Sequence, residues 1–228
     1  MAVLGTSGYF IGDTNCGGAL NNARQEFISL FDRVSQFHGF GPIISDVDVC
    51  RLYRERKPLW VVAYDQLRYM PAVYELALKV APLVKQAGIA MPSVGAKIVV
   101  RADIPNDDNW NFPPHQDYPF NGGSLNSVTV WMPFQNCDIE HGALQIVPSS
   151  HTRGELPEKD NLLIDPPKEC DYIDAPVRLG EALVFSQMLL HRSGYNRSNG
   201  VRFSIQLRFN DLASEEYLKR NLSNANNP

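Results

Sequence analysis

The sequence has few cysteines, and none of them are paired at a metal-binding or redox spacing. The four cysteines lie far apart along the chain and form no C-x-x-C pattern. This argues against a zinc knuckle and a disulfide framework, so we expect free thiols. A chain of 228 residues is long enough to bury a core without such cross-links.

Long apolar runs and an excess of basic charge are also missing. No segment approaches the length of a membrane span, and residues 1–13 lack the regions of a secretory signal, which predicts a cytoplasmic protein. The 21 basic and 25 acidic side chains give a formal charge of -4. This balance is not typical of proteins that bind nucleic acid or an anionic membrane. We therefore expect a small-molecule partner, and no pattern predicts an oligomeric state.

Two segments in the first part of the chain have apolar residues at helical spacing. One amphipathic helix is predicted for residues 22–36. A second is predicted for residues 71–88, beginning at Pro71 in a position that suits a first helical turn. Pro82 falls inside this second segment and is expected to kink it.

After Pro92 the pattern changes to short runs of Val, Ile, Leu and Phe separated by turn-forming residues. The predicted strands are residues 96–104, 127–135, 142–148, 181–190 and 201–210, with a polar insertion at 152–176. Many short strands preceded by helices predict a mainly β fold with flanking helices, an antiparallel barrel or sandwich. We expect one domain over residues 1–228, divided into a helical part packed on the barrel (1–92), the barrel core (93–211) and a tail (212–228).

Histidine is scarce, so few of the five histidines can be metal ligands. His115 and Asp117 follow two prolines that favour an extended chain, in which residues two apart point to the same side. His191 ends an apolar run where a predicted strand emerges. Two imidazoles and one carboxylate form the facial triad that binds iron(II) and leaves positions open for an oxidant and a co-substrate. We interpret His38, His141 and His151 as structural or surface residues.

The last predicted strand alternates polar with apolar residues after the Asn199-Gly200 turn signal. If this strand returns beside the one that ends in His191, Arg202 points into the metal cavity. Its guanidinium can bind a carboxylate bidentately, and Ser204 can add a hydroxyl donor. A dicarboxylic 2-oxoacid fits this arrangement. Alternatively, His191 is a buried barrel histidine and the polar face is a solvated sheet surface.

The sequence resembles the phytanoyl-CoA dioxygenase family over residues 96–211. The resemblance is carried by HQD at 115–117, by TVWMPFQNCDIEHGALQIVPSSH at 129–151 and by LLHRSGYNRSNGVRFSIQLRF at 189–209. Members of this family are iron(II)- and 2-oxoglutarate-dependent oxygenases on a double-stranded β-helix, a jelly-roll or cupin-like barrel. The resemblance therefore implies that fold here.

The resemblance also implies roles for individual residues. The iron ligands would be His115, Asp117 and His191. The residues that bind or line the 2-oxoglutarate site would be Arg202, eleven residues after the distal histidine, with Ser204 and Trp131. Near the predicted mouth, the residues that can touch a substrate are Arg101, Trp110, Tyr118, Phe120 and Gln187, each of which is equally suited to packing.

The implied activity is hydroxylation of a small-molecule metabolite, with consumption of oxygen and 2-oxoglutarate and release of succinate and carbon dioxide. Desaturation, epimerisation and ring formation remain open alternatives, because the same oxidant can carry them out. Halogenation is disfavoured by Asp117, because halogenases replace the metal carboxylate with a small residue. A cupin-like isomerase or a non-catalytic metal or 2-oxoglutarate sensor is a further alternative, but it leaves Arg202 and Ser204 unexplained.

Overall fold

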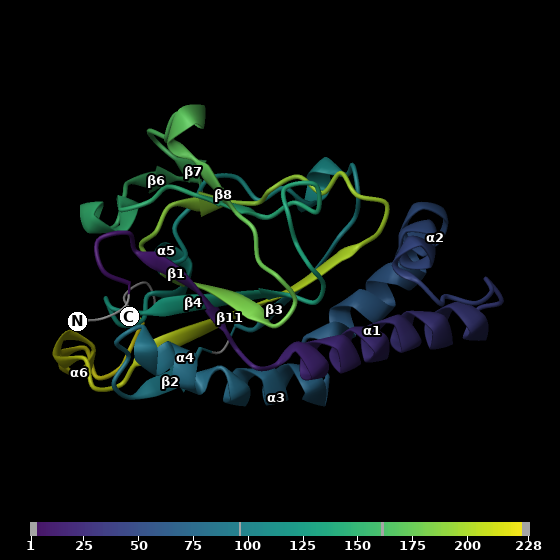
Figure 1. Ribbon diagram of the computed structural model, residues 1–228, viewed down its shortest axis with the longest axis horizontal. Coiled ribbons are helices and arrows are strands. Elements are labelled where there is room, and N and C mark those ends of the chain that lie inside the picture. Colours follow the sequence, from purple (N-terminus) through teal and green to yellow (C-terminus); the bar gives the residue numbers. More distant parts are fainter. Residues whose placement is uncertain (1–3, 96, 161, 225–228) are drawn as a thin grey trace.

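Two antiparallel sheets form the centre of the computed structural model, which describes residues 4–95, 97–160 and 162–224. The larger sheet has the order β1-β9-β4-β11-β2, with β3 also paired to β11, and the smaller has the order β10-β5-β8. Figure 1 shows the smaller sheet lying across from the larger one. The strands are β1 (Tyr9–Asp13), β2 (Pro92–Val94), β3 (Val99–Asp103), β4 (Val128–Pro133), β5 (Leu144–Ile146), β6 (Glu158–Lys159), β7 (Leu162–Leu163), β8 (Ile173–Ala175), β9 (Glu181–Ser186), β10 (His191–Arg192) and β11 (Arg202–Asp211).

Each of the five predicted strand segments contains a strand, and the mainly β prediction is confirmed. The first strand, β1, was not predicted, because five residues are too short to show a clear alternation. It pairs with β9 over its whole length, with Tyr9 opposite Phe185. The predicted polar insertion contains β6, β7 and β8.

Four helices precede the barrel, and they lie along one face and one end of the larger sheet (Figure 1). They are α1 (Gly17–Phe37), α2 (Asp46–Leu67), α3 (Pro71–Lys79) and α4 (Ala81–Gln86), and two short helices follow later, α5 (Tyr118–Asn121) and α6 (Glu215–Lys219). The predicted first helix is present in α1, and the predicted second helix is broken into α3 and α4 beside Pro82. Helix α2 was not predicted, and it contains both Pro58 and a non-helical residue, Arg56.

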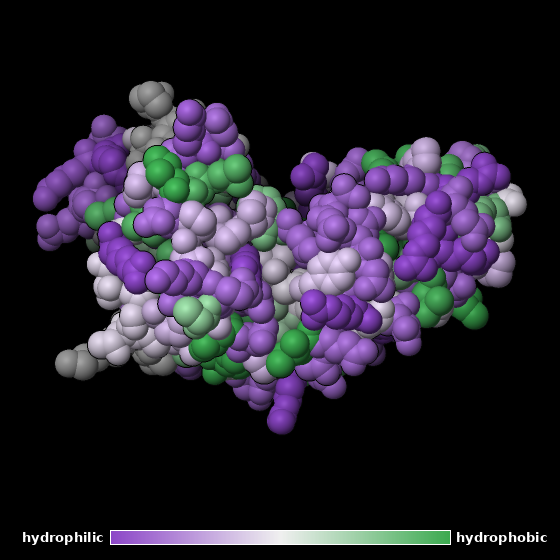
Figure 2. All heavy atoms as spheres, turned by 90° about the horizontal axis from the view of Figure 1, so that it is seen from above, coloured by the Kyte–Doolittle hydropathy of each residue, from purple (hydrophilic) through white to green (hydrophobic). Residues whose placement is uncertain are grey.

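The face drawn in Figure 2 is mostly hydrophilic, with separate small hydrophobic areas. Across the described parts of the chain, none of the helices combines the length and apolarity that a bilayer crossing requires. All four cysteines are free thiols, as predicted.

Strand β11 separates the two cores of the molecule, and this positions the site. Its odd-numbered residues face the helices, where the Phe203 ring lies 5.7 Å from that of Phe27 in α1. Its even-numbered residues therefore face the barrel interior, because side chains alternate along a strand. Arg202 is 1% exposed and Ser204 is fully buried, which rules out the solvated-surface alternative for this part of the polar face.

Candidate metal centre

His115, Asp117 and His191 come together inside the barrel. The backbone N–H of His115 donates to the carbonyl of His191 at 3.0 Å, and that of His191 donates back at 3.1 Å. This reciprocal pairing sets the two imidazole rings 4.1 Å apart. Asp117 follows at the start of α5, and one potential ligand atom from each of the three residues lies within 4.8 Å of the others.

Backbone carbonyls orient both histidine rings. The Nδ1 atom of His115 lies 2.8 Å from the carbonyl oxygen of Pro113, and that of His191 lies 3.0 Å from the carbonyl oxygen of Leu189. A ring nitrogen that faces a carbonyl carries the proton, so Nε2 keeps its lone pair. The Nε2 atom of His191 is buried and has no protein partner. Both rings thus present a free nitrogen of the kind that binds a metal.

Burial also keeps the imidazoles in their metal-binding form. Burial, together with the neighbouring His191, lowers the pKa of His115 to about 3. Burial likewise lowers the pKa of His191, against the opposing effect of Asp117. Both rings are therefore neutral at physiological pH, which is the protonation state that a metal requires.

Asp117 is buried and held by two side chains that sequence reasoning did not identify. The hydroxyl of Thr129 in β4 donates to Oδ2 at 2.6 Å, and Arg208 in β11 donates to Oδ1 at 2.8 Å. Burial alone would raise the pKa of Asp117, but Arg208 and the two histidines outweigh it and hold that pKa well below its usual range. The carboxylate is therefore ionised and fixed in orientation.

The other three histidines lie apart from this group. His38 caps the C-terminal end of α1. The Nδ1 atom of His141 lies 2.7 Å from a carboxylate oxygen of the exposed Asp138. His151 packs against Gly8, where an added Cβ would lie 2.3 Å from the imidazole Nδ1.

A cavity of about 240 Å³ opens beside the triad. Arg101 and Phe120, both expected near the mouth, line it. Tyr118 and Gln187 are buried and do not line it, and the Gln187 side chain instead donates to the carbonyl of Val128. Trp110, also expected near the mouth, packs with aromatic side chains of α2. Cavity residues that sequence reasoning missed include Lys97, Phe112, Ser193, Gln206 and Arg208.

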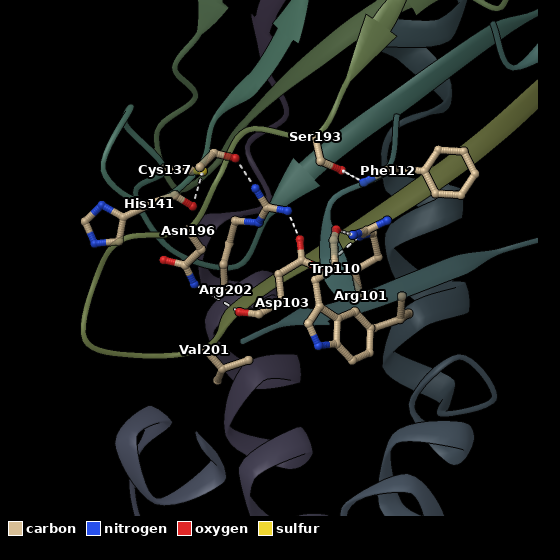
Figure 3. A network of polar contacts seen from close by, with 12 residues as sticks. Arg101, Asp103, Trp110, Phe112, Cys137, His141, Ser193, Asn196, Val201 and Arg202 are labelled. Atoms are coloured by element: carbon tan, nitrogen blue, oxygen red, sulfur yellow. Dashed lines mark hydrogen bonds and ion pairs between the residues drawn. The ribbon is translucent and has the colours of Figure 1, made fainter. Parts of the chain in front are cut away.

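Arg202 is buried inside the barrel, but it is not among the residues that line this cavity. Its Nη1 donates to the carbonyl of Gly142, and its Nη2 forms an ion pair with Asp103 (Figure 3). A side chain at Gly142 would be strained, because its φ is +76° and a Cβ would lie 2.7 Å from the carbonyl oxygen of Gly194 and 2.9 Å from Nη1 of Arg202. Burial and the nearby Arg101 lower the pKa of Arg202 to about 9, so the group stays charged at neutral pH.

Several buried polar atoms close to Arg202 have no protein partner. They are Nε of Arg202, Oγ of Ser204 and Nε1 of Trp131. The guanidinium carbon of Arg202 lies 5.9 Å from the centre of the Trp131 ring, and Ser204 follows Arg202 on the same face of β11. Unpaired buried donors are costly, so these atoms are candidate contacts for a bound ligand. These are the three residues predicted for the co-substrate.

Comparison with known proteins identifies relatives that cover part of the chain. Peroxisomal phytanoyl-CoA dioxygenase of Bos taurus is 31% identical in an alignment of 114 residues, and the match covers 43% of this chain and 33% of that protein. Methylphosphonate hydroxylase of Gimesia maris (strain ATCC 29201 / DSM 8797 / 534-30) is 32% identical in an alignment of 109 residues, and the match covers 45% of this chain and 42% of that protein. The chain thus spans less than half the length of either relative.

Solved structures show the fold. The apo form of the non-haem monooxygenase ThoJ superposes with a TM-score of 0.59 at 19% identity, covering 91% of this chain and 75% of that one. The epimerase SnoN, in complex with Fe³⁺, α-ketoglutarate and nogalamycin RO, gives a TM-score of 0.57 at 17% identity, covering 91% and 80%. The predicted double-stranded β-helix is therefore confirmed.

The family match covers more of the chain than the match to either of these two sequence relatives. The model of the phytanoyl-CoA dioxygenase (PhyH) family matches residues 56–204. That range is more than half of the chain, and it includes the histidine and aspartate triad, Arg202 and Ser204. The resemblance read from the sequence motifs is confirmed, and the chain belongs to the phytanoyl-CoA dioxygenase family.

Proposed function

We propose that this protein is an iron(II)- and 2-oxoglutarate-dependent dioxygenase that hydroxylates a small-molecule metabolite and releases succinate and carbon dioxide. The observation that carries the proposal is the convergence of His115, Asp117 and His191 beside a cavity, with ligand atoms within 4.8 Å. Three protein ligands on one face of iron leave coordination positions for a keto acid and oxygen. When bound, the metal and the co-substrate supply the oxidising chemistry that attacks a substrate C–H bond.

The residues around the triad would prepare it for the metal. Thr129 and Arg208 hold the Asp117 carboxylate in one orientation, and backbone carbonyls hold the two imidazoles. Partners of this kind fix the tautomer and direction of metal ligands and strengthen binding. The metal would therefore enter a preformed site at little cost in side-chain entropy.

We propose that Arg202 binds the distal carboxylate of 2-oxoglutarate, assisted by Ser204 and Trp131. The three unpaired buried donors on these residues support this role. An arginine suits it because its guanidinium stays charged and its unpaired Nε–H can donate to a carboxylate while Gly142 and Asp103 hold the two Nη groups. We further propose that residues 1–228 act as one oxygenase domain, in which the helices of residues 1–92 pack on the barrel core of residues 93–211, while β1 is part of the larger sheet itself.

An anaerobic titration tests the proposed cofactors directly. Iron(II) with 2-oxoglutarate should give the weak visible absorption band of a keto acid chelated to such a centre. Admission of oxygen together with a panel of small metabolites should then give stimulated release of succinate. Absence of the band, or a zinc site with four protein ligands, would contradict the proposal.

The products distinguish hydroxylation from its alternatives. The names of the two relatives, a dioxygenase and a hydroxylase, support hydroxylation. Incorporation of labelled oxygen from O₂ into the product is the expected result. An unsaturated, epimerised or cyclised product without the label would assign another outcome to the same site, and 2-oxoglutarate binding without turnover on any substrate would favour a sensor.

A further inference from the structure

The cavity beside the triad carries more positive than negative charge. Its lining includes three basic side chains, Lys97, Arg101 and Arg208, but only one carboxylate, that of Asp117. Arg208 is paired with Asp117 at 2.8 Å. Lys97 and Arg101 are therefore the basic groups of the cavity that the metal centre does not use.

Arg101 lines the cavity, and two of its three guanidinium nitrogens are held by protein partners (Figure 3). Its Nε donates to Asp103 at 2.9 Å, and its Nη2 donates to the carbonyl of Trp110. Nη1 has no protein partner within the described parts of the chain. Asp103 does not cancel the charge of Arg101, because the same carboxylate also pairs with Arg202. The Arg101 side chain is only 13% exposed, so solvent screens it weakly.

Lys97 adds a second unneutralised charge at the open side of the cavity. It is an exposed residue just before β3, and its ammonium donates to the carbonyl of Phe120 at 3.3 Å. No carboxylate pairs with it among the residues that the structure describes. Lys97 also lines two neighbouring surface pockets. It therefore lies on the side of the cavity that a ligand from solvent would reach first.

This step rests on the proposed function. When iron(II) and 2-oxoglutarate are bound, the charges of Arg101 and Lys97 remain uncompensated. Doubly charged iron(II) and doubly charged 2-oxoglutarate cancel each other, and Asp117 and Asp103 offset Arg208 and Arg202. We propose that Arg101 and Lys97 bind an anionic group of the prime substrate, a carboxylate, phosphonate or phosphate. The substrates would thus be small oxyanionic metabolites.

The volume and the apolar lining of the cavity indicate the size and character of the remaining part of the substrate. Its volume of about 240 Å³ is below the roughly 300–1,000 Å³ of sites that take drug-sized ligands. Its apolar walls are Val99, Phe112, Phe120 and Leu144. A short hydrocarbon part therefore fits between these walls, with its C–H bonds facing the triad and its oxyanion on Arg101.

The test uses the full chain loaded anaerobically with iron(II) and 2-oxoglutarate. The probes are carboxylates and phosphonates of up to about six carbons, each matched with its neutral amide or alcohol. Binding is read from the change in the visible band, and stimulated succinate release is read after oxygen is admitted. We expect at least one anionic probe to bind and stimulate, and its neutral counterpart to do neither.

Two substitutions test whether Arg101 and Lys97 bind the anionic group of the probe, and a third substitution serves as the control. Arg101→Gln should weaken binding of an active probe about 30-fold or more, because it removes one partner of a largely buried charge-assisted contact. Lys97→Gln, at an exposed position where folding is not at risk, should weaken it a few-fold. The exposed helical variant Lys85→Gln should bind the probe as the unmodified protein does.

The outcomes separate this inference from the proposed function. Absence of the visible band in the unmodified protein would reject the proposed function. With the band present, equal binding of anionic and neutral probes, binding of neither, or unchanged binding in both Arg101→Gln and Lys97→Gln would reject the oxyanion site. Because Lys97→Gln keeps the Arg101–Asp103 contact, the test still holds if Arg101→Gln does not fold.

Discussion

At the scale of the residue, Arg202 is positioned before any co-substrate binds. Asp103 and the carbonyl of Gly142 hold two of its three guanidinium nitrogens, while Nε remains unpaired. A side chain already fixed in place loses little conformational freedom when a ligand arrives. The contact with Asp103 also compensates the charge of the buried guanidinium before a ligand binds. Burying that charge without a partner would be costly.

Replacing Arg202 should weaken the co-substrate selectively. Removing one partner of a buried charge pair typically costs about 2–5 kcal/mol, so Arg202→Ala should raise the apparent 2-oxoglutarate constant by roughly 30-fold or more. Arg202→Lys should recover part of the loss, because it keeps the charge but not the planar fork. The measurement is anaerobic titration of the visible band. Arg51→Ala, at a more exposed ion pair, is the control, and an unaltered constant in Arg202→Ala would refute the assignment.

Asp117 supports a second prediction at this scale. Asp117→Ala should lose hydroxylation and should not gain halogenation in chloride, because halide binding also needs a suitable pocket. His115→Ala and His191→Ala should lower iron affinity, measured by anaerobic dialysis, and leave the fold intact by circular dichroism. His151→Ala is the matched control and should keep nearly full turnover. Hydroxylation at the unmodified rate in Asp117→Ala would show that this carboxylate is not a ligand.

At the scale of the element, β11 shows what could be read from the sequence. The alternation of Arg202 and Ser204 with apolar residues revealed one strand with two faces, and the structure buries the apolar face throughout and the polar face at Arg202 and Ser204. The partners Asp103 and Thr129 could not be read, because they depend on the register of β11 with β3 and β4. That register joins segments up to about a hundred residues apart, and alternation within one strand does not encode it.

Helix α2 was missed for a different physical reason. Arg56 leaves helical geometry and Pro58 follows it, so the apolar residues before and after the kink do not share one helical phase. The charged stretch from Arg54 to Lys57 further hides the period. A single 3.6-residue pattern therefore could not fit the whole element.

The second half of α2 should nevertheless be essential for stability. Trp60 is 1% exposed, and its ring lies 4.5 Å from Tyr64 and 5.3 Å from Trp110. Trp60→Ala should lower the free energy of unfolding by about 3–5 kcal/mol, as large-to-small core changes do. Val62, in the same helix, is 55% exposed, so Val62→Ala should stay within about 0.5 kcal/mol. The measurement is urea unfolding, and an equal loss of unfolding free energy in Trp60→Ala and Val62→Ala would contradict the buried packing of Trp60.

The end of β11 should contribute stability that depends on pH. Asp211 accepts hydrogen bonds from the backbone of Met91 at 2.8 Å and from Asn126 at 2.9 Å. Burial alone would raise the pKa of Asp211, but these hydrogen bonds outweigh it and lower that pKa. A carboxyl with a lowered folded-state pKa stabilises the fold above its unfolded pKa, near 3.9, and this contribution is lost as the pH falls through the folded value.

Asp211→Asn should therefore lower the free energy of unfolding by about 1–3 kcal/mol at pH 7, and the difference should shrink below about pH 4. Urea unfolding at several pH values measures both effects. Asp165→Asn, at an exposed position, is the control and should change little. A difference for Asp211→Asn that is the same at pH 7 and pH 3 would show that the charge of this carboxyl is not involved.

At the scale of the whole molecule, total charge and local charge point in opposite directions. The chain carries a formal charge of -4, yet the cavity beside the triad collects Lys97, Arg101 and Arg208. The composition argued against a protein that binds nucleic acid, but it could not predict a basic cavity. These basic side chains come from two segments, residues 97–101 and β11, which are far apart along the chain and meet only after β3 has paired with β11.

Binding of the metal and co-substrate should stabilise the whole fold, because the unfolded chain cannot bring His115 and His191 together. A ligand at 100 times its dissociation constant adds about 2.7 kcal/mol. For a protein of this size that is a rise in Tm of roughly 5–11 °C. Anaerobic thermal unfolding with iron(II) and 2-oxoglutarate measures the shift. Glutarate, which has both carboxylates but no keto group to complete the chelate, should give a smaller rise, and His115→Ala should give almost none. An equal rise in His115→Ala would mean that the ligands stabilise the protein at some other place than this triad.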